Sequence, residues 1–184
     1  EGEGQRVYLS PTPQDEETAR AASPTWRPAE PLPAEDTANF WCTLYGLANY
    51  GDLFTDRQLV ALTKFSDLVA TTVERVNRDA RASSVSDDDP TFSDEGKSST
   101  AYAEALAAYL SMCLSRQANR ASTLNFWDTK GENIQQVFAR QALPMTWDFV
   151  EGNPFSNSTG NFVGQADYMA RVLEVSVPAC PGGH

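Results

Sequence analysis

Apolar residues recur every three or four positions along residues 59–76, which is the spacing of one face of an α-helix. Charged residues lie between them and would occupy the flanks of that helix. Thr55, followed three residues later by Gln58, forms a capping-box pattern that marks the start of the helix. We therefore predict a long helix over about 56–81 and expect it to form the spine of the core. Its apolar positions are Leu59, Leu62, Phe65, Leu68 or Val69, Val73 and Val76.

A second stripe with the same period predicts a helix over about 100–119, with Ser99 or Thr100 as its cap. The acidic, serine-rich segment 83–99 between the two helices is long enough to return the chain. We therefore expect the helices to pack antiparallel as a hairpin. The apolar positions of the second helix are Tyr102, Ala105, Leu106, Tyr109, Leu110, Cys113, Leu114 and Ala118.

Two shorter helices are predicted after the hairpin. The first covers about 132–142, buries Ile134 and Val137 with their apolar neighbours, and is stopped by Pro144. The second covers about 162–173, with Val163, Ala166, Ala170 and Leu173 on its apolar face. No alternating run is long enough to build a sheet of any size. The expected fold is therefore mainly α, a helical hairpin plus two shorter helices, with few or no strands.

Residues 1–39 are rich in proline and acidic residues and form an irregular N-terminal arm. Within it we expect a short strand at 6–10, one short helix at about 14–22 and an extended, polyproline-like stretch at 23–37. The stretch either wraps the body, with Trp26 as an anchor, or forms a loose linker. The expected organisation is an arm (1–39), a helical domain (40–177) and a tail (178–184). We expect the aromatic segment 40–50 to pack at the entry to the long helix, with a stacking surface as the alternative.

The net charge of −11 argues against strong DNA binding by this chain, because phosphate contacts depend on basic side chains. The acidic residues are concentrated in the arm and in the loop 83–99, whereas segments 50–82 and 100–150 contain equal numbers of acidic and basic residues. Neither a membrane-length apolar run nor a signal peptide is evident, so we expect a cytoplasmic protein with no membrane partner. Because the chain begins at Glu1 rather than Met, we expect it to be a piece of a longer protein.

Few residues are suited to metal binding or to acid–base catalysis. The cysteines Cys42, Cys113 and Cys180 are too far apart in sequence for a zinc motif. We favour reduced thiols over a Cys42–Cys113 disulfide. The only histidine is His184, which argues against a histidine-based site. The acidic run 87–89 lacks the spacing of a calcium loop and is expected to be a solvated charge run.

Two sequence blocks carry a family resemblance. The first is GDLFTDRQLVALTKFSDLV at 51–69; the second comprises STLNFWD at 122–128, FARQALPMTWDF at 138–149 and NPFS at 153–156. Together they resemble a segment of the large bacterial adenine-specific DNA methylases that contain an inserted zinc ribbon and occur beside anti-phage systems. The similarity spans roughly residues 6–173.

The resemblance places this chain between the two catalytic motifs of that family. Amino-methylating DNA enzymes need a glycine-rich loop for S-adenosylmethionine and an Asp/Asn-Pro-Pro-aromatic motif that holds the flipped base. Neither motif occurs here, and Asn153-Pro154-Phe155, with a single proline, is best interpreted as a structural turn. The resemblance therefore implies a non-catalytic insertion that has no cofactor of its own. Its implied partners are the remainder of the methyltransferase, which binds S-adenosylmethionine, and DNA through that parent.

In such an insertion, the roles that the resemblance implies are target recognition, cleft closure or bracing. The candidate DNA contacts are Arg116, Arg120, Asn125, Trp127, Arg140, Gln141, Trp147, Asn153 and Phe155. Each has a structural alternative: Arg140 could pair with Asp148 or Glu151, the two tryptophans could be core residues, and Asn125 could cap a turn.

Two other functions stay open. The first is a helical protein-interaction module with no nucleic-acid role, which would use the acidic arm and loop. The second is a self-contained hydrolase that uses Asp148, Glu151 or Asp167, although their spacing places no pair of them together on one helical face.

Overall fold

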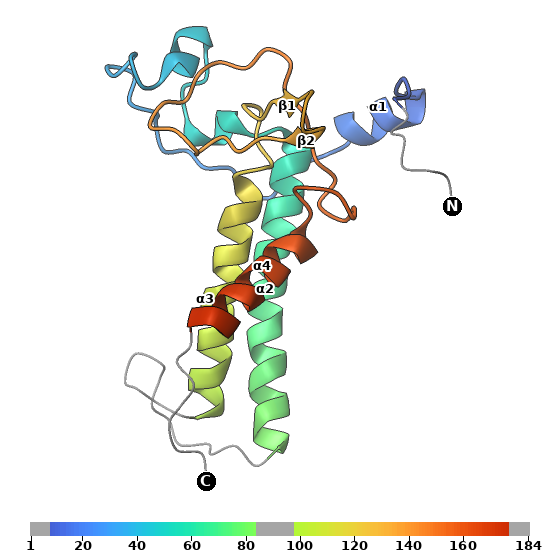
Figure 1. Cartoon of the computed structure of the whole chain (residues 1–184), viewed down its shortest axis with the longest axis vertical. Helices are drawn as coiled ribbons and strands as arrows, with labels where there is room; N and C mark the ends of the chain where they lie inside the picture. Colours follow the sequence, from blue (N-terminus) through green and yellow to red (C-terminus); the bar gives the residue numbers. More distant parts are fainter. Residues whose placement is uncertain (1–7, 84–97, 177–184) are drawn as a thin grey trace.

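The computed structural model describes residues 8–83 and 98–176 and is mainly helical, as predicted (Figure 1). The described residues form four α-helices, two 3-10 turns and one antiparallel pair of two-residue strands. The elements are α1 (Pro13–Arg20), η1 (Trp41–Tyr45), η2 (Tyr50–Leu53), α2 (Asp56–Ala82), α3 (Ser99–Ala118), β1 (Trp127–Asp128), β2 (Asn133–Ile134) and α4 (Phe162–Ser176).

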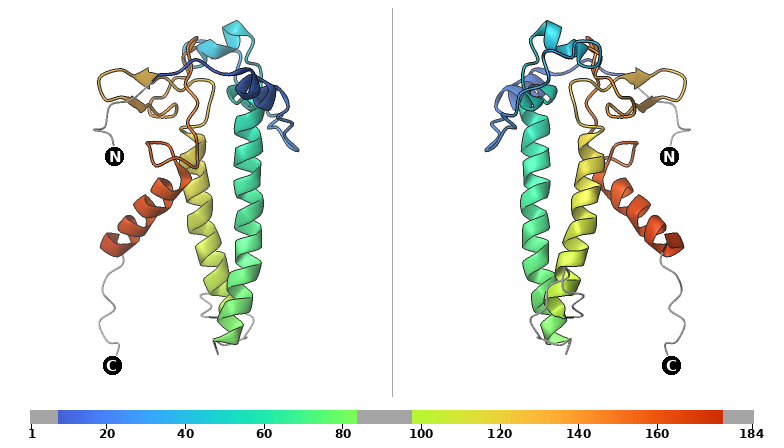
Figure 2. Two further views of the ribbon diagram at one scale, coloured as in Figure 1. Left: turned by 90° about the vertical axis from the view of Figure 1, so that its right-hand side faces the viewer. Right: turned by 90° about the vertical axis from the view of Figure 1, so that its left-hand side faces the viewer.

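Helices α2 and α3 form the predicted antiparallel hairpin, and α4 packs against α3 while leaning away from the hairpin (Figure 2). The capping box at the start of α2 is confirmed. The backbone amide of Gln58 donates to Thr55 Oγ1 at 3.3 Å, and the backbone amide of Thr55 donates to Gln58 Oε1 at 2.9 Å. Helix α3 begins slightly earlier than predicted, because the hydroxyl of Ser98, not that of Ser99 or Thr100, accepts the Ala101 amide at 3.1 Å.

The buried faces differ from the predicted stripes at several positions. In α2, Leu59 and Phe65 are buried as predicted, but Leu68 is 57% exposed. Tyr102 of α3 and Val163 of α4 are 62% and 68% exposed, so neither lies on a buried face. Each helix is covered on only part of its apolar stripe.

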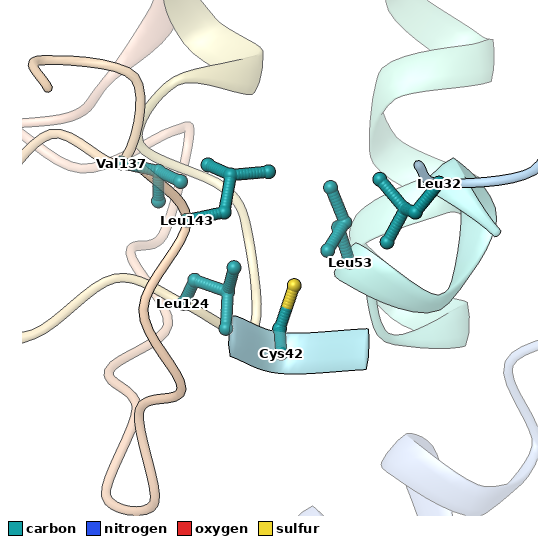
Figure 3. Close-up of a cluster of buried hydrophobic side chains, with 6 residues drawn as sticks. All are labelled: Leu32, Cys42, Leu53, Leu124, Val137 and Leu143. Carbon is teal, nitrogen blue, oxygen red and sulfur yellow. The ribbon is translucent and has the colours of Figure 1, made fainter. Parts of the chain in front are cut away.

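A cluster of buried apolar side chains lies at one end of the hairpin (Figure 3). The irregular segments before α2 and after α3 cross this end and contribute all of its side chains. The long helix contributes Leu59 and Phe65 to the buried residues, packed with α3, but it does not contribute to this cluster. The cluster comprises Leu32, Cys42, Leu53, Leu124, Val137 and Leu143.

The arm wraps the body, as one of the two alternatives predicted. The Leu32 amide donates to the Ala48 carbonyl at 2.8 Å, and the Tyr50 amide donates to the Glu30 carbonyl at 2.9 Å. Arg27 Nη1 donates to the Gly51 carbonyl at 2.7 Å, and Arg27 also pairs with Asp56 at the start of α2. The anchors are thus the Arg27 side chain and the buried Leu32, rather than Trp26, which is 60% exposed.

The predicted helix over 132–142 is wrong. Residues 133–134 form strand β2 instead, and 137–141 form turns. The reason lies in long-range hydrogen bonds: Asn119 accepts the Val137 amide on its carbonyl at 3.2 Å and the Phe138 amide on its side chain at 2.8 Å. These partners replace the contacts that a helix would have supplied.

Two further expectations concern the arm and the chain ends. Residues 8–10 of the expected strand at 6–10 are not in a strand, while α1 agrees with the helix expected at about 14–22. Residues 6 and 7, most of the acidic loop including 87–89, and the tail 178–184 lie outside the described residues.

Candidate functional site

A cleft of about 550 Å³ opens where the start of α2, the end of α3 and the segment 151–155 meet. Its lining is largely apolar, and its polar residues come from four separate parts of the chain. The lining residues are Thr18, Arg57, Gln58, Ala61, Leu62, Phe65, Gln117, Ala121, Glu151, Gly152, Asn153, Pro154 and Phe155.

Gln58 contributes an amide group that is only partly used within the protein. Its Oε1 accepts the Thr55 amide as part of the capping box, which fixes the orientation of the side-chain amide. Its Nε2 has no hydrogen-bond partner among the described residues, although Gln58 is only 6% exposed. A buried donor without a partner is rare in proteins and energetically unfavourable.

Gln117, from the last turn of α3, has the opposite arrangement. Its Nε2 donates to the Gly160 carbonyl at 2.7 Å, so its orientation is also fixed by the backbone. Within residues 8–83 and 98–176 its Oε1 has no hydrogen-bond partner, and Gln117 is only 1% exposed. Both glutamines are among the residues that line the cleft, but the two atoms without a partner are themselves enclosed by the protein.

The charged residues that line the cleft neutralise each other. Glu151 forms an ion pair with Arg57, and Glu151 Oε1 accepts the Thr55 hydroxyl at 2.7 Å. The Glu151 side chain is 15% exposed and that of Arg57 is 52% exposed. This pair ties the segment 151–155 to the start of α2, and no other charged side chain lines the cleft in the described part of the chain.

Three phenylalanines form an aromatic group beside the cleft. The rings of Phe65 and Phe162 are stacked, with centroids 4.3 Å apart, and this contact joins α4 to α2. Phe155 lies at the rim with its ring centroid 5.5 Å from that of Phe65, and it is 79% exposed. The cleft thus has an ordered aromatic wall and one solvent-facing ring.

Of the predicted DNA-contact residues, only Asn153 and Phe155 line this cleft. The segment from Asn153 to Gly160 is turn-rich, as expected. Asn153 Oδ1 accepts the Phe155 amide at 2.9 Å, and its carbonyl accepts the Ser156 amide at 3.1 Å. Asn153 therefore shapes the turn that presents Phe155, which agrees with the structural interpretation of this motif.

Two of the predicted arginines are engaged within the fold. Arg116 Nε donates to Gln165 Oε1 at 3.1 Å, and its guanidinium lies 4.0 Å from the centre of the Tyr168 ring. Arg120 donates to the Ile134 carbonyl. Burial, with a smaller contribution from the nearby charge of Arg116, lowers the pKa of Arg120 from its usual value. Arg116 thus holds α3 against α4, and Arg120 holds the segment after α3 against β2.

Asn125 is fully buried and acts as a structural hub. Its Oδ1 accepts the Ser122 amide at 2.7 Å, and its Nδ2 donates to the carbonyls of Asn119 and Gln135 at 3.0 and 2.7 Å. The alternative that Asn125 caps a turn is therefore confirmed. Trp127 lies half-buried in β1, opposite Ile134.

The remaining candidates, Arg140, Gln141 and Trp147, are exposed. Glu151, one of the two carboxylates suggested for Arg140, is bound by Arg57 instead. Trp147 is 71% exposed, which excludes a core role, and it meets the ring of Tyr45 edge-on with centroids 5.0 Å apart. Trp41 and Leu44, in the same turn η1 as Tyr45, are also exposed. We call Trp41, Leu44, Tyr45 and Trp147 the η1 aromatic surface. The packing predicted for the segment 40–50 holds for Cys42, which is buried, and for Phe40 and Leu47, which pack against the core cluster.

The described residues offer no group of cysteine, histidine or acidic side chains arranged to hold a metal ion. Cys42 and Cys113 are buried free thiols, as favoured, and burial raises the pKa of each. Among the carboxylates considered for a hydrolase, Asp148 and Asp167 are exposed, while Glu151 is held by Arg57 and Thr55.

The sequence did not lead us to predict that Gln58 and Gln117 line a common cleft. Gln58 was interpreted only as a cap, and Gln117 lies between apolar positions of the second stripe without attracting attention. A polar residue flanked by stripe positions near a helix end is the signal that would have pointed to Gln117.

No family model, curated protein or solved structure matches this chain. In the part of the chain that the structure covers, the helices are too short or too polar to cross a membrane.

Proposed function

We propose that this chain is a non-catalytic accessory domain of an S-adenosylmethionine-dependent DNA adenine methyltransferase, and that it braces the catalytic part mainly through protein contacts. The sequence resemblance supports the enzyme class. The observation that carries the bracing role is the η1 aromatic surface, whose large rings face solvent at the end of the molecule where the core lies. Exposed aromatic residues are typical of protein interfaces and are often their energetic centres.

The geometry favours bracing over direct DNA recognition. Arg116, Arg120 and Asn125 are bound by other parts of the fold and would have to break those contacts to reach DNA. Arg140 and Gln141 are exposed and are the DNA contacts that we retain. The net charge of −11 also limits affinity for a phosphate backbone.

The coding sequence of the parent gene provides the first test. It should encode a glycine-rich cofactor loop upstream of this segment and an Asp-Pro-Pro-Tyr motif downstream of it. A parent that lacks both motifs would refute the proposed enzyme class.

A binding experiment tests the bracing role. The chain, co-expressed with the remainder of the methyltransferase, should co-purify with it, and Trp147→Ala should weaken the complex at least about tenfold, as expected for an interface hot spot. Trp26→Ala is the matched control, because Trp26 is also an exposed tryptophan (60%) but lies on the arm. Equal binding by the two variants would contradict the role of the η1 aromatic surface.

A protein-interaction module with no nucleic-acid role is the second candidate. The occupied arginines and the acidic net charge favour it. The two functions separate in a DNA titration of the complete parent: salt-sensitive binding that Arg140→Ala weakens supports the methyltransferase domain, whereas the absence of DNA binding by the parent supports the interaction module.

A further inference from the structure

The charges around the η1 aromatic surface define the kind of partner that this surface fits. We propose that it docks a basic segment of a partner protein, whose arginine side chains stack on the exposed rings and pair with the carboxylates beside them. The inference deepens the bracing role and rests on it, because it names the chemistry of the surface that this domain would contact in the remainder of the methyltransferase.

Two segments of the chain form the end of the molecule that carries the η1 aromatic surface (Figure 1). They are residues 28–55 and 141–150, and the Leu143 amide joins them by donating to the Asn39 carbonyl at 2.6 Å. Neither segment contains a lysine, an arginine or a histidine. The carboxylates that they contain are Glu30, Glu35, Asp36, Asp52 and Asp148.

These carboxylates are not neutralised by the fold. None of them forms an ion pair with a basic side chain in residues 8–83 and 98–176. Arg27 and Arg57, which border the first segment, are paired with carboxylates outside both segments. Arg140 lies just before the second segment. The negative charge of these two segments is therefore available to the cations of a partner.

The aromatic rings supply the second half of the surface. Tyr45 and Trp147 meet edge-on and are 54% and 71% exposed, and Trp41 is 56% exposed, so part of each ring is open to solvent. Asp148, which is also exposed, directly follows Trp147 in the chain. An arginine guanidinium binds both kinds of group, because it stacks on aromatic faces and pairs with carboxylates.

The same charges argue against other occupants. A nucleic acid would bring phosphates to two segments that have carboxylates and no base. A second copy of the chain would bring the same acidic surface, so that like charges would face each other. An uncharged partner would cover the rings and leave the carboxylates without an opposite charge. A basic protein segment matches both the rings and the carboxylates.

Two matched peptides test the proposal by calorimetry and by the NMR signals of the tryptophan indoles. In the first, arginine alternates with glycine; in the second, citrulline, which has the shape of arginine without its charge, replaces each arginine. At low ionic strength the arginine peptide should bind with a dissociation constant of about 1 mM or tighter and should shift the indole signals of Trp41 and Trp147. The citrulline peptide should bind at least about tenfold more weakly, because it loses the cation–π and ion-pair contributions.

Two pairs of variants separate docking on this surface from general attraction to an acidic chain. Trp147→Ala should weaken binding of the arginine peptide by about threefold or more, whereas Trp26→Ala, on the arm, should leave it unchanged. Asp148→Asn should weaken it by about twofold or more, whereas Asp167→Asn, which removes an exposed carboxylate of α4, should leave it unchanged. All four side chains are exposed, so the variants should keep the fold.

Three results would overturn the proposal. The arginine peptide does not bind up to about 10 mM, the citrulline peptide binds as tightly, or the two variants of either pair behave alike. Dimerisation of the chain that Trp147→Ala abolishes would identify a second copy as the occupant and would overturn it as well.

The outcome can be told apart from that of the proposed function. A complex with the remainder of the methyltransferase that Trp147→Ala weakens, together with no peptide binding, would leave the bracing role standing and overturn the basic partner. Peptide binding by a chain whose parent lacks the methyltransferase motifs would leave the docking surface standing and overturn the enzyme class.

Discussion

Replacement of Asn125 by alanine should destabilise the fold strongly, although the sequence alone made this residue a candidate for DNA contact. Asn125 is 0% exposed, and its side chain makes three hydrogen bonds, to Ser122, Asn119 and Gln135. The Asn119 carbonyl keeps a second donor, the Val137 amide. The buried Ser122 amide and the Gln135 carbonyl would lose their partners.

At about 1–3 kcal/mol for each unsatisfied buried group, Asn125→Ala should lower the free energy of unfolding by about 2–6 kcal/mol. Urea unfolding followed by circular dichroism measures this change directly. Asn153→Ala is the matched control: Asn153 is exposed, and its side chain accepts one local hydrogen bond, from the Phe155 amide. Asn153→Ala should lower the free energy of unfolding by less than about 1 kcal/mol.

A pH series gives an independent check of the same geometry. Asn125→Asp keeps the acceptor for the Ser122 amide but turns a carboxylate oxygen toward the Asn119 and Gln135 carbonyls. Burial and these carbonyls should raise the pKa of the introduced carboxyl in the folded state above its unfolded value. The stability deficit of the variant relative to the unmodified chain should therefore be smallest at low pH, where the carboxyl is protonated. The deficit should grow as the pH rises through the folded pKa. Equal losses for Asn125→Ala and Asn153→Ala, together with a flat pH response, would refute the proposed hub.

Three further outcomes are expected. Gly51→Ala should destabilise the fold by about 1–3 kcal/mol in urea unfolding, because the added Cβ would lie 2.5 Å from the Pro28 carbonyl oxygen and displace the arm; no change would contradict the docked arm. Cys42 and Cys113 should react with Ellman's reagent much more slowly in the folded chain than in urea, since both are buried with raised pKa values; equal rates would contradict their burial. Trp147→Ala should change the free energy of unfolding by less than about 0.5 kcal/mol, since Trp147 is 71% exposed; a larger loss would indicate a structural role.

The hairpin was predictable because its signals are local. The Thr55–Gln58 capping box and an apolar stripe that begins with Leu59 predict helix α2. Apolar residues with the same helical spacing predict α3. The burial of individual side chains was predicted less well: Leu68 and Tyr102 fit the apolar stripes but are exposed in the structure. Periodicity reports which residues share a face and does not report whether another element covers that face.

The helix predicted over 132–142 shows a second limit. Ile134 and Val137 have helical spacing, and both are buried, but they are buried by a strand and by turns. The deciding contacts come from Asn119 and Asn125, which lie in the segment after α3 and bind the backbone of 135–138. Contacts between separate segments leave no local pattern in either segment.

The cleft escaped prediction for the same reason. Gln58 and Gln117 belong to different helices, and only the antiparallel hairpin brings them to one site. In each glutamine the backbone binds one atom of the side-chain amide, and this decides which of the two amide atoms is left without a partner. That information is present in the Thr55 and Gly160 hydrogen bonds and absent from the sequence pattern.

Calorimetric titration with S-adenosylmethionine, performed on this chain and on its full-length parent, tests the proposed accessory role most directly. The parent should bind the cofactor and this chain should not, because the glycine-rich loop that holds the cofactor is absent from this sequence. Binding by the chain alone, or a parent that does not bind S-adenosylmethionine at all, would contradict a non-catalytic domain of a methyltransferase.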